Sequence, residues 1–113
     1  MIKNNSVYIK HILDQITHIE NFMRGVSEEQ FSTDIEKEYA IIRCFEIIGE
    51  ASKKIDDNFK NKYPQIPWRK MAAFRDVLIH DYDRLVSEVI WKTVIDEIPT
   101  LKDSLVQIRN DES

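Results

Sequence analysis

Apolar residues recur along most of this chain at the three- and four-residue spacing of amphipathic helices. The first helix is expected to follow the polar cluster Asn4–Ser6 and to end at Gly25. Ser27 then opens a short sequence with the form of a capping box, and Thr33 or Asp34 begins a second long helix. The apolar positions of the first helix are Ile9, Ile12, Leu13, Ile16, Ile19 and Met23. Those of the second are Ile35, Tyr39, Ile42, Phe45, Ile48, Gly49, Ser52 and Ile55.

Two prolines divide the second half of the chain. Residues before proline avoid the α region, so Tyr63–Pro67 is expected to be extended, and Pro67 can begin a third helix. Its apolar face contains Trp68, Met71, Phe74, Leu78 and Ile79. A last helix begins near Ser87, and Pro99 should kink or break it. Its apolar positions are Val89, Ile90, Val94, Ile95, Ile98, Leu101, Leu105 and Ile108. The pattern predicts one all-α domain over residues 1–113, an antiparallel bundle of four main helices with a frayed tail at 109–113.

Composition supports this fold class. With 2 Gly and 3 Pro in 113 residues, the chain lacks the turn residues of β sandwiches and the repeats of collagen. A single cysteine, Cys44, excludes an intrachain disulfide and a cysteine-based zinc site, and is most simply a buried small apolar residue. No apolar run approaches the ~20 residues of a membrane span, and the first residues do not resemble a signal peptide. We therefore expect a cytoplasmic protein.

Charge is unevenly distributed, although the net charge is only −4. Residues 51–75 contain 7 basic and 2 acidic side chains, whereas the segments on either side are acidic. Such a basic window can hold a phosphate backbone, or it can be a solvated helix end and loop. Its basic residues besides Arg75 are Lys53, Lys54, Lys60, Lys62, Arg69 and Lys70.

The third helix contains an unusual group of polar residues. Arg75 falls within the apolar arc, where arginine is rare unless its guanidinium has a partner, and Tyr82 follows seven residues later. Asp76 and His80 are neighbours one turn apart, but Arg75 and His80 are separated by roughly 140° around the helix. Either the helix ends near His80, or a second copy of the chain completes a site. In a purely structural alternative, Arg75 reaches a carboxylate at the core edge, His80 caps the helix and Tyr82 packs.

Arg75, His80 and Tyr82 form the pattern Rx4HxY, and five further blocks accompany it. These blocks are Ile41–Arg43, Glu46–Ala51, Ile66–Arg69, Leu78–Tyr82 and Ile98–Pro99. With them the chain resembles the HEPN superfamily from about residue 6 to residue 108. The closest likeness is to the HepT-like toxins of HEPN/nucleotidyltransferase modules.

The resemblance implies a helical homodimer, or a higher even oligomer, that acts as a metal-independent endoribonuclease toxin without a cofactor. In this interpretation His80 is the general acid/base, and Arg75 holds the scissile phosphate of the RNA. Asp76 orients His80 or pairs with Arg75. The basic window becomes a candidate track for the RNA backbone.

Tyr82 has a second implied role. By resemblance, a cognate nucleotidyltransferase antitoxin adenylylates this tyrosine and so blocks the site. Other family members have Asn at the position of Asp76. An alternative function is a non-catalytic HEPN-type subunit that docks a nucleotidyltransferase; the sequence pI of 5.4 favours it, whereas the intact Arg75 and His80 favour the nuclease.

Two other clusters are weaker candidates. His11, Asp14 and His18 share one face of the first helix and could bind a metal, but a solvated polar face is the commoner outcome. Glu46 and Glu50 could line a cleft or pair with a basic residue such as Arg43.

Overall fold

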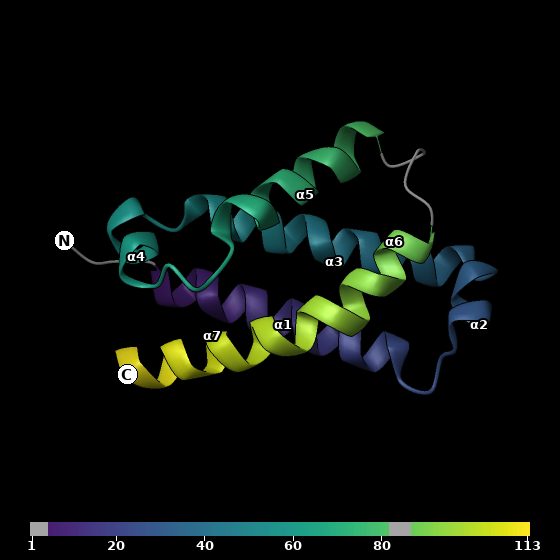
Figure 1. The fold of residues 1–113 in the computed structure, drawn as a ribbon, viewed down its shortest axis with the longest axis horizontal. Helices are drawn as coiled ribbons and strands as arrows, with labels where there is room; N and C mark the ends of the chain where they lie inside the picture. Colours follow the sequence, from purple (N-terminus) through teal and green to yellow (C-terminus); the bar gives the residue numbers. More distant parts are fainter. Residues whose placement is uncertain (1–4, 82–86) are drawn as a thin grey trace.

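The computed structural model describes residues 5–81 and 87–113, and every element in these two segments is a helix (Figure 1). The elements are α1 (Asn5–Met23), α2 (Glu28–Ser32), α3 (Ile35–Lys54), α4 (Asp57–Lys62), α5 (Trp68–Asp81), α6 (Ser87–Lys92), the π-helical η2 (Thr93–Glu97) and α7 (Ile98–Glu112). The long helix α3 packs against both α1 and α5, and α7 packs against α1. The predicted all-α bundle is confirmed. None of the helices in the described segments has the length and apolarity that a bilayer span requires.

Local sequence signals set most of the helix ends. Gly25, with φ of 71°, ends the turn after α1 in the left-handed region that glycine adopts without strain. Ser27 and Gln30 form the predicted capping box, in which each side chain accepts a hydrogen bond from the other residue's N–H, at 3.1 and 2.9 Å. Asp34 caps α3 by accepting from the N–H of Lys37 at 3.0 Å. Of the two residues predicted to begin this helix, Thr33 and Asp34, the structure has Asp34 as the capping residue.

The short helix α4 was not predicted. Asp56 caps it, since its carboxylate accepts from the N–H of Phe59 at 2.8 Å, and Asn5 at the start of α1 donates to the same carboxylate at 3.1 Å. The pair Asp56-Asp57 before Phe59 was an available capping signal. Helix α3 accordingly ends at Lys54, and the buried Ile55 follows it.

The segment before α5 is held by a side chain that follows it. The segment Tyr63–Pro67, which was expected to be extended, is instead a turn, closed by a hydrogen bond from the N–H of Ile66 to the carbonyl of Tyr63 at 3.2 Å. The indole N–H of Trp68 donates to the same carbonyl at 3.0 Å and fixes this turn, which contains both prolines. Helix α5 begins directly after Pro67, as predicted.

Pro99 interrupts the last helix, as expected, because α6 ends at Lys92 and a separate α-helix, α7, begins at Ile98. Helices α6 and α7 are joined through the π-helical turn η2, in which the N–H of Ile98 bonds to the carbonyl of Thr93. Proline lacks an N–H and crowds the carbonyl four residues before it, so a widened turn ahead of Pro99 absorbs both effects. Helix α7 then continues to Glu112, which accepts hydrogen bonds from Lys62 and Tyr63. The tail expected to fray is instead helical up to that residue.

The core is made by apolar side chains from all four long helices and the short segments between them. Its most deeply buried members are Ile12, Ile16, Ile19, Phe31, Ile41, Leu78, Ile90, Leu105 and Ile108. Some positions of the predicted apolar faces are exposed: Ile35, Tyr39, Ile79, Val89 and Ile95. Three of these five directly adjoin a buried neighbour, as Ile79 adjoins Leu78. Since successive helical residues point 100° apart, a residue next to one at the centre of the buried face lies at the edge of that face and can be exposed.

Helices α3 and α5 approach closely at Gly49. A methyl group at this position would overlap the Cβ of Arg75 and lie 3.0 Å from the carbonyl oxygen of Met71. The missing side chain therefore determines how near the arginine lies to α3.

We expect Gly49→Ala to destabilise the protein. Overpacking costs about 1–3 kcal/mol, which should outweigh the ~1 kcal/mol that alanine gains over glycine inside a helix. Urea unfolding measures the difference. The double variant Gly49→Ala/Arg75→Gly removes the side chain on α5 that the new methyl group on α3 would overlap. It should recover most of the lost free energy of unfolding. A stabilised Gly49→Ala protein would show that the two helices are not in close contact.

Candidate active site

Arg75 lies at the seam between α3 and α5, with 24% of its side chain exposed. Its Nη2 is 3.6 Å from a carboxylate oxygen of Glu50, and its Nη1 donates to Oδ1 of Asp76 at 3.1 Å. Its Nε is buried and has no hydrogen-bond partner among the described residues. The partners explain how a guanidinium is tolerated in an apolar arc, as the structural alternative expected. The unsatisfied Nε shows that the arrangement is not a completed ion-pair network.

Asp76 binds a second cation. The Nζ of Lys53 on α3 donates to the same Oδ1 at 3.1 Å. These hydrogen bonds, first from Lys53 and then from Arg75, lower the pKa of Asp76 below its ordinary value. Asp76 is thus a shared anion between two cations on different helices, and it stays ionised at neutral pH.

The charge cluster continues along α3. Arg43 lies 3.3 Å from Glu46 and 3.9 Å from Glu50, which in turn contacts Arg75. Glu46 and Glu50 were expected either to line a cleft or to pair with a basic residue such as Arg43, and the structure shows the pairing. The contact of Glu50 with Arg75 was not foreseen, because the sequence does not reveal which residue of α3 faces Arg75. The result is an alternating row of charges over the α3–α5 seam, formed by Arg43, Glu50, Arg75, Asp76 and Lys53.

His80 is separate from this row. It lies in the last turn of α5 with its imidazole exposed, and no hydrogen bond joins it to Asp76 in the described segments. Asp76 was considered as a residue that orients His80 or that pairs with Arg75. In the structure it pairs with Arg75. Arg75 and His80 are not brought together within one chain, as their spacing on the helix indicated. Tyr82 lies outside the described residues.

The basic window does not form one continuous surface. Besides Lys53 in the charge row, Lys70 pairs with Glu97 at 3.4 Å, and Lys62 pairs with Glu112 at 2.8 Å. Lys54 lies over the ring of Tyr8, Lys60 belongs to α4, and Arg69 is exposed on α5. Only Lys53 is in direct contact with the cluster around Arg75.

The weaker candidates have ordinary surroundings. Asp14 pairs with Lys10 at 2.9 Å, and His18 lies beside the ring of Phe22. No group of three potential metal ligands occurs in the segments that the structure describes. Burial raises the pKa of the Cys44 thiol to about 11, so this cysteine is not a reactive thiolate at neutral pH.

Comparison with known proteins identifies the family. The family described as "Ribonuclease HepT-like" matches residues 12–108, which is most of the chain and includes both long helices of the charge row. The chain belongs to the ribonuclease HepT-like family. The resemblance inferred from the sequence blocks is thereby confirmed, together with its all-α fold and its ribonuclease class.

Individual relatives agree with this assignment. A "Probable ribonuclease HepT" of Thermococcus cleftensis is 44% identical over 109 residues, covering 96% of this chain and 99% of that protein. A "Putative RNase" of Caldanaerobacter subterraneus subsp. tengcongensis is 36% identical, covering 95% of this chain and 96% of its own. Another "Putative RNase", from Methanocaldococcus jannaschii, is 39% identical, covering 86% of this chain and 80% of its own. No solved structure matches the chain significantly.

Replacing Lys53 should change the titration of Asp76. Because Lys53 is the largest cause of the lowered pKa, Lys53→Met should move that pKa upward, toward the ordinary value of about 3.9. The stabilisation from a depressed carboxyl pKa is present above the unfolded value and is lost as pH falls through the folded value. The variant should therefore lose less stability than the wild type on acidification.

Carbon-detected NMR titration of the Asp76 carboxyl measures this shift directly. Lys54→Met is the matched control, since Lys54 lies over the Tyr8 ring and not beside Asp76. Equal shifts in both variants would mean that bulk charge, and not the hydrogen bond from Lys53, sets the pKa.

Proposed function

We propose that this protein is a metal-independent endoribonuclease that acts as the toxin of a HEPN/nucleotidyltransferase toxin–antitoxin pair. The observation that carries the proposal is Arg75 at the α3–α5 seam, next to Lys53 and on the same helix as the exposed His80. Membership of a ribonuclease family supports the reaction class. The motif Rx4HxY supplies the two groups that cleavage of RNA through its own 2′-hydroxyl requires.

The proposed reaction is an internal transesterification. The 2′-oxygen attacks the adjacent phosphorus, the bond from phosphorus to the 5′-oxygen breaks, and the products carry a 2′,3′-cyclic phosphate and a 5′-hydroxyl. His80 either accepts the proton of the 2′-hydroxyl or donates one to the leaving 5′-oxygen, since imidazole titrates near neutral pH. Arg75 stabilises the charge that builds on the phosphate oxygens.

Dimerisation would solve the geometric difficulty of the single chain. Arg75 and His80 lie on different sides of α5, so one copy does not direct both at the same phosphodiester. In a twofold assembly, two copies of α5 can face each other and place an arginine and an imidazole on either side of one cleft. Two histidines would then also serve as the base and the acid of one reaction.

RNA must compete with carboxylates for Arg75. Glu50 and Asp76 contact its guanidinium in the protein without RNA. A phosphate can replace one of them as a bidentate partner of arginine. Lys53, already beside Asp76, would retain that carboxylate when Arg75 turns to the phosphate. The other basic-window residues would contribute as separate contacts along a bound RNA and not as one track.

Tyr82 is the proposed site of neutralisation by the cognate nucleotidyltransferase antitoxin. Transfer of AMP from ATP to its hydroxyl forms a phosphodiester and releases pyrophosphate. The added negative charge, two residues after His80 in sequence, would repel RNA and compete for nearby cations.

The second candidate is a non-catalytic HEPN-type subunit that docks a nucleotidyltransferase. The two carboxylates on Arg75 favour it, because they reduce the positive charge available for RNA. It predicts a stable complex with the transferase but no RNA cleavage.

Substitution at the two proposed catalytic groups should abolish activity. We expect His80→Ala to lower RNA cleavage by roughly 10²–10⁴-fold, the usual contribution of an acid/base group. Arg75→Ala should lower it by roughly 10²–10³-fold, the usual loss when a group that stabilises transition-state charge is removed. The same variants should relieve growth arrest when expressed in bacteria. Purified protein with labelled RNA, followed by analysis of the 3′ ends for the cyclic phosphate, measures the reaction.

His18→Ala is the matched control, since His18 is an exposed histidine on α1. It should cleave RNA like the wild type. A wild-type protein without any cleavage would favour the docking subunit instead. Cleavage that persists in both Arg75→Ala and His80→Ala would contradict the site.

Modification of Tyr82 should be visible by mass. Incubation with ATP and the cognate transferase is expected to add AMP units to the intact protein and to stop RNA cleavage. Tyr82→Phe should prevent the addition, whereas Tyr39→Phe, at an exposed tyrosine of α3, should not. Addition to Tyr82→Phe would place the modification elsewhere.

A further inference from the structure

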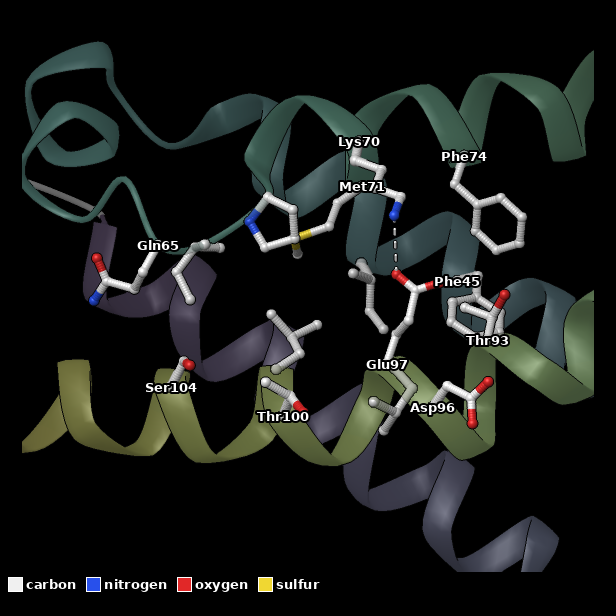
Figure 2. Close-up of a pocket in the computed structure, with 15 residues that line it drawn as sticks. Phe45, Gln65, Lys70, Met71, Phe74, Thr93, Asp96, Glu97, Thr100 and Ser104 are labelled. Carbon is white, nitrogen blue, oxygen red and sulfur yellow. Dashed lines mark ion pairs between the residues drawn. The ribbon is translucent and has the colours of Figure 1, made fainter.

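A cavity of about 390 Å³ lies between α5 and the helical run η2–α7, away from the charge row (Figure 2). We call it the α5–α7 groove. Its floor is apolar and comes from Phe45 and Ile48 of α3, with Met71, Phe74 and Leu101 along its walls. The volume is that of sites for small organic ligands. Nothing in the proposed ribonuclease mechanism uses this space.

The groove exists because its two walls rest on different helices. Helix α5 packs on α3, whereas α7 packs on α1, so α5 and α7 stand apart across the face seen in Figure 1. An ion pair between Lys70 and Glu97, at 3.4 Å, crosses the opening (Figure 2). Both side chains are largely exposed, at 73% and 50%, and such pairs contribute little to stability. The pair can therefore open without disturbing the core.

The rim of the groove is acidic. The π-helical turn η2 places Asp96 and Glu97 in succession on one side, and Lys70 is the only cation that lines the described cavity. Lys70 is already shared with Glu97, and no basic side chain of the described segments pairs with Asp96. The groove thus combines an apolar interior with one uncompensated carboxylate at its edge.

The dimensions favour a small molecule over a helix. An α-helix with its side chains is about 10 Å wide and could enter only after the ion pair between Lys70 and Glu97 has opened. A slender apolar chain or ring can lie beneath that pair.

We propose that the α5–α7 groove binds a small amphipathic cation. The ligand has an elongated apolar body, which lies on Phe45, Met71 and Phe74. It also has one ammonium group, which pairs with Asp96 or Glu97 at the rim. This site is independent of RNA cleavage and of Tyr82, so it can be tested whether or not the protein is a nuclease.

A matched series of three probes tests the proposal on the full chain. The probes are 4-phenylbutylammonium, 4-phenylbutanol and 4-phenylbutyrate, which share one apolar body and differ in charge. In a ¹H–¹⁵N NMR titration, the ammonium should saturate, with the largest shifts in residues 70–74 and 93–101. The alcohol should bind roughly three- to tenfold more weakly, and the carboxylate more weakly still.

Substitution of the rim acids provides the second arm. Asp96→Asn/Glu97→Gln should reduce ammonium binding to that of the alcohol, whereas Asp103→Asn, an exposed acid of α7 outside the groove, should leave it unchanged. Equal affinity for the three probes, no saturable binding, or shifts confined to other helices would overturn the proposal. So would an ammonium preference that survives in the double variant.

Discussion

The structure depends on how closely α5 can approach α3, and one glycine sets that distance. Gly49 leaves room for the Cβ of Arg75, and this brings the guanidinium within 3.6 Å of Glu50 on the opposite helix. Had any larger residue stood there, the arginine would be displaced outward, and its partners with it. The close packing of the two helices at Gly49 and the ion pair between Arg75 and Glu50 therefore depend on each other. The helix–helix contact that buries Leu78 also holds Arg75 at the protein surface in a fixed direction.

In the proposed function, the same contact reconciles an acidic protein with a site for a polyanion. Along the seam, three cations alternate with two carboxylates: Arg43, Glu50, Arg75, Asp76 and Lys53. The carboxylates separate the cations and partly neutralise them. In the proposed mechanism, an RNA phosphate then replaces a carboxylate at Arg75. Arginine paired to exposed carboxylates gains little from each pair. A phosphodiester that takes two guanidinium hydrogen bonds can therefore exchange with them at small cost. This balance makes Asp76 a determinant of RNA affinity in the proposed mechanism.

Much of this fold could be predicted from local signals, because those signals act within a few residues. Ser27 with Gln30, Gly25 and Asp34 each fix one helix end through bonds to their own neighbours. The motif blocks predicted the family, which is now shown, and the site that they indicate stays a prediction. Contacts between residues that are far apart in the sequence could not be predicted from it. Whether Asp76 pairs with His80 or Arg75 depends on where Lys53 lies, and whether Leu78 or Ile79 is buried depends on the angle at which α5 meets α3.

Pro99 illustrates the limit most clearly. The sequence predicts only that a regular helix cannot pass through it, and both a break and a kink satisfy that condition. The chain interrupts the α-helix with one widened turn, which places Asp96 and Glu97 on the side that faces α5. A regular helix would rotate these carboxylates relative to the groove. On α5, Met71 and Phe74 line this groove and lie one turn and one residue, respectively, before Arg75, which packs against α3.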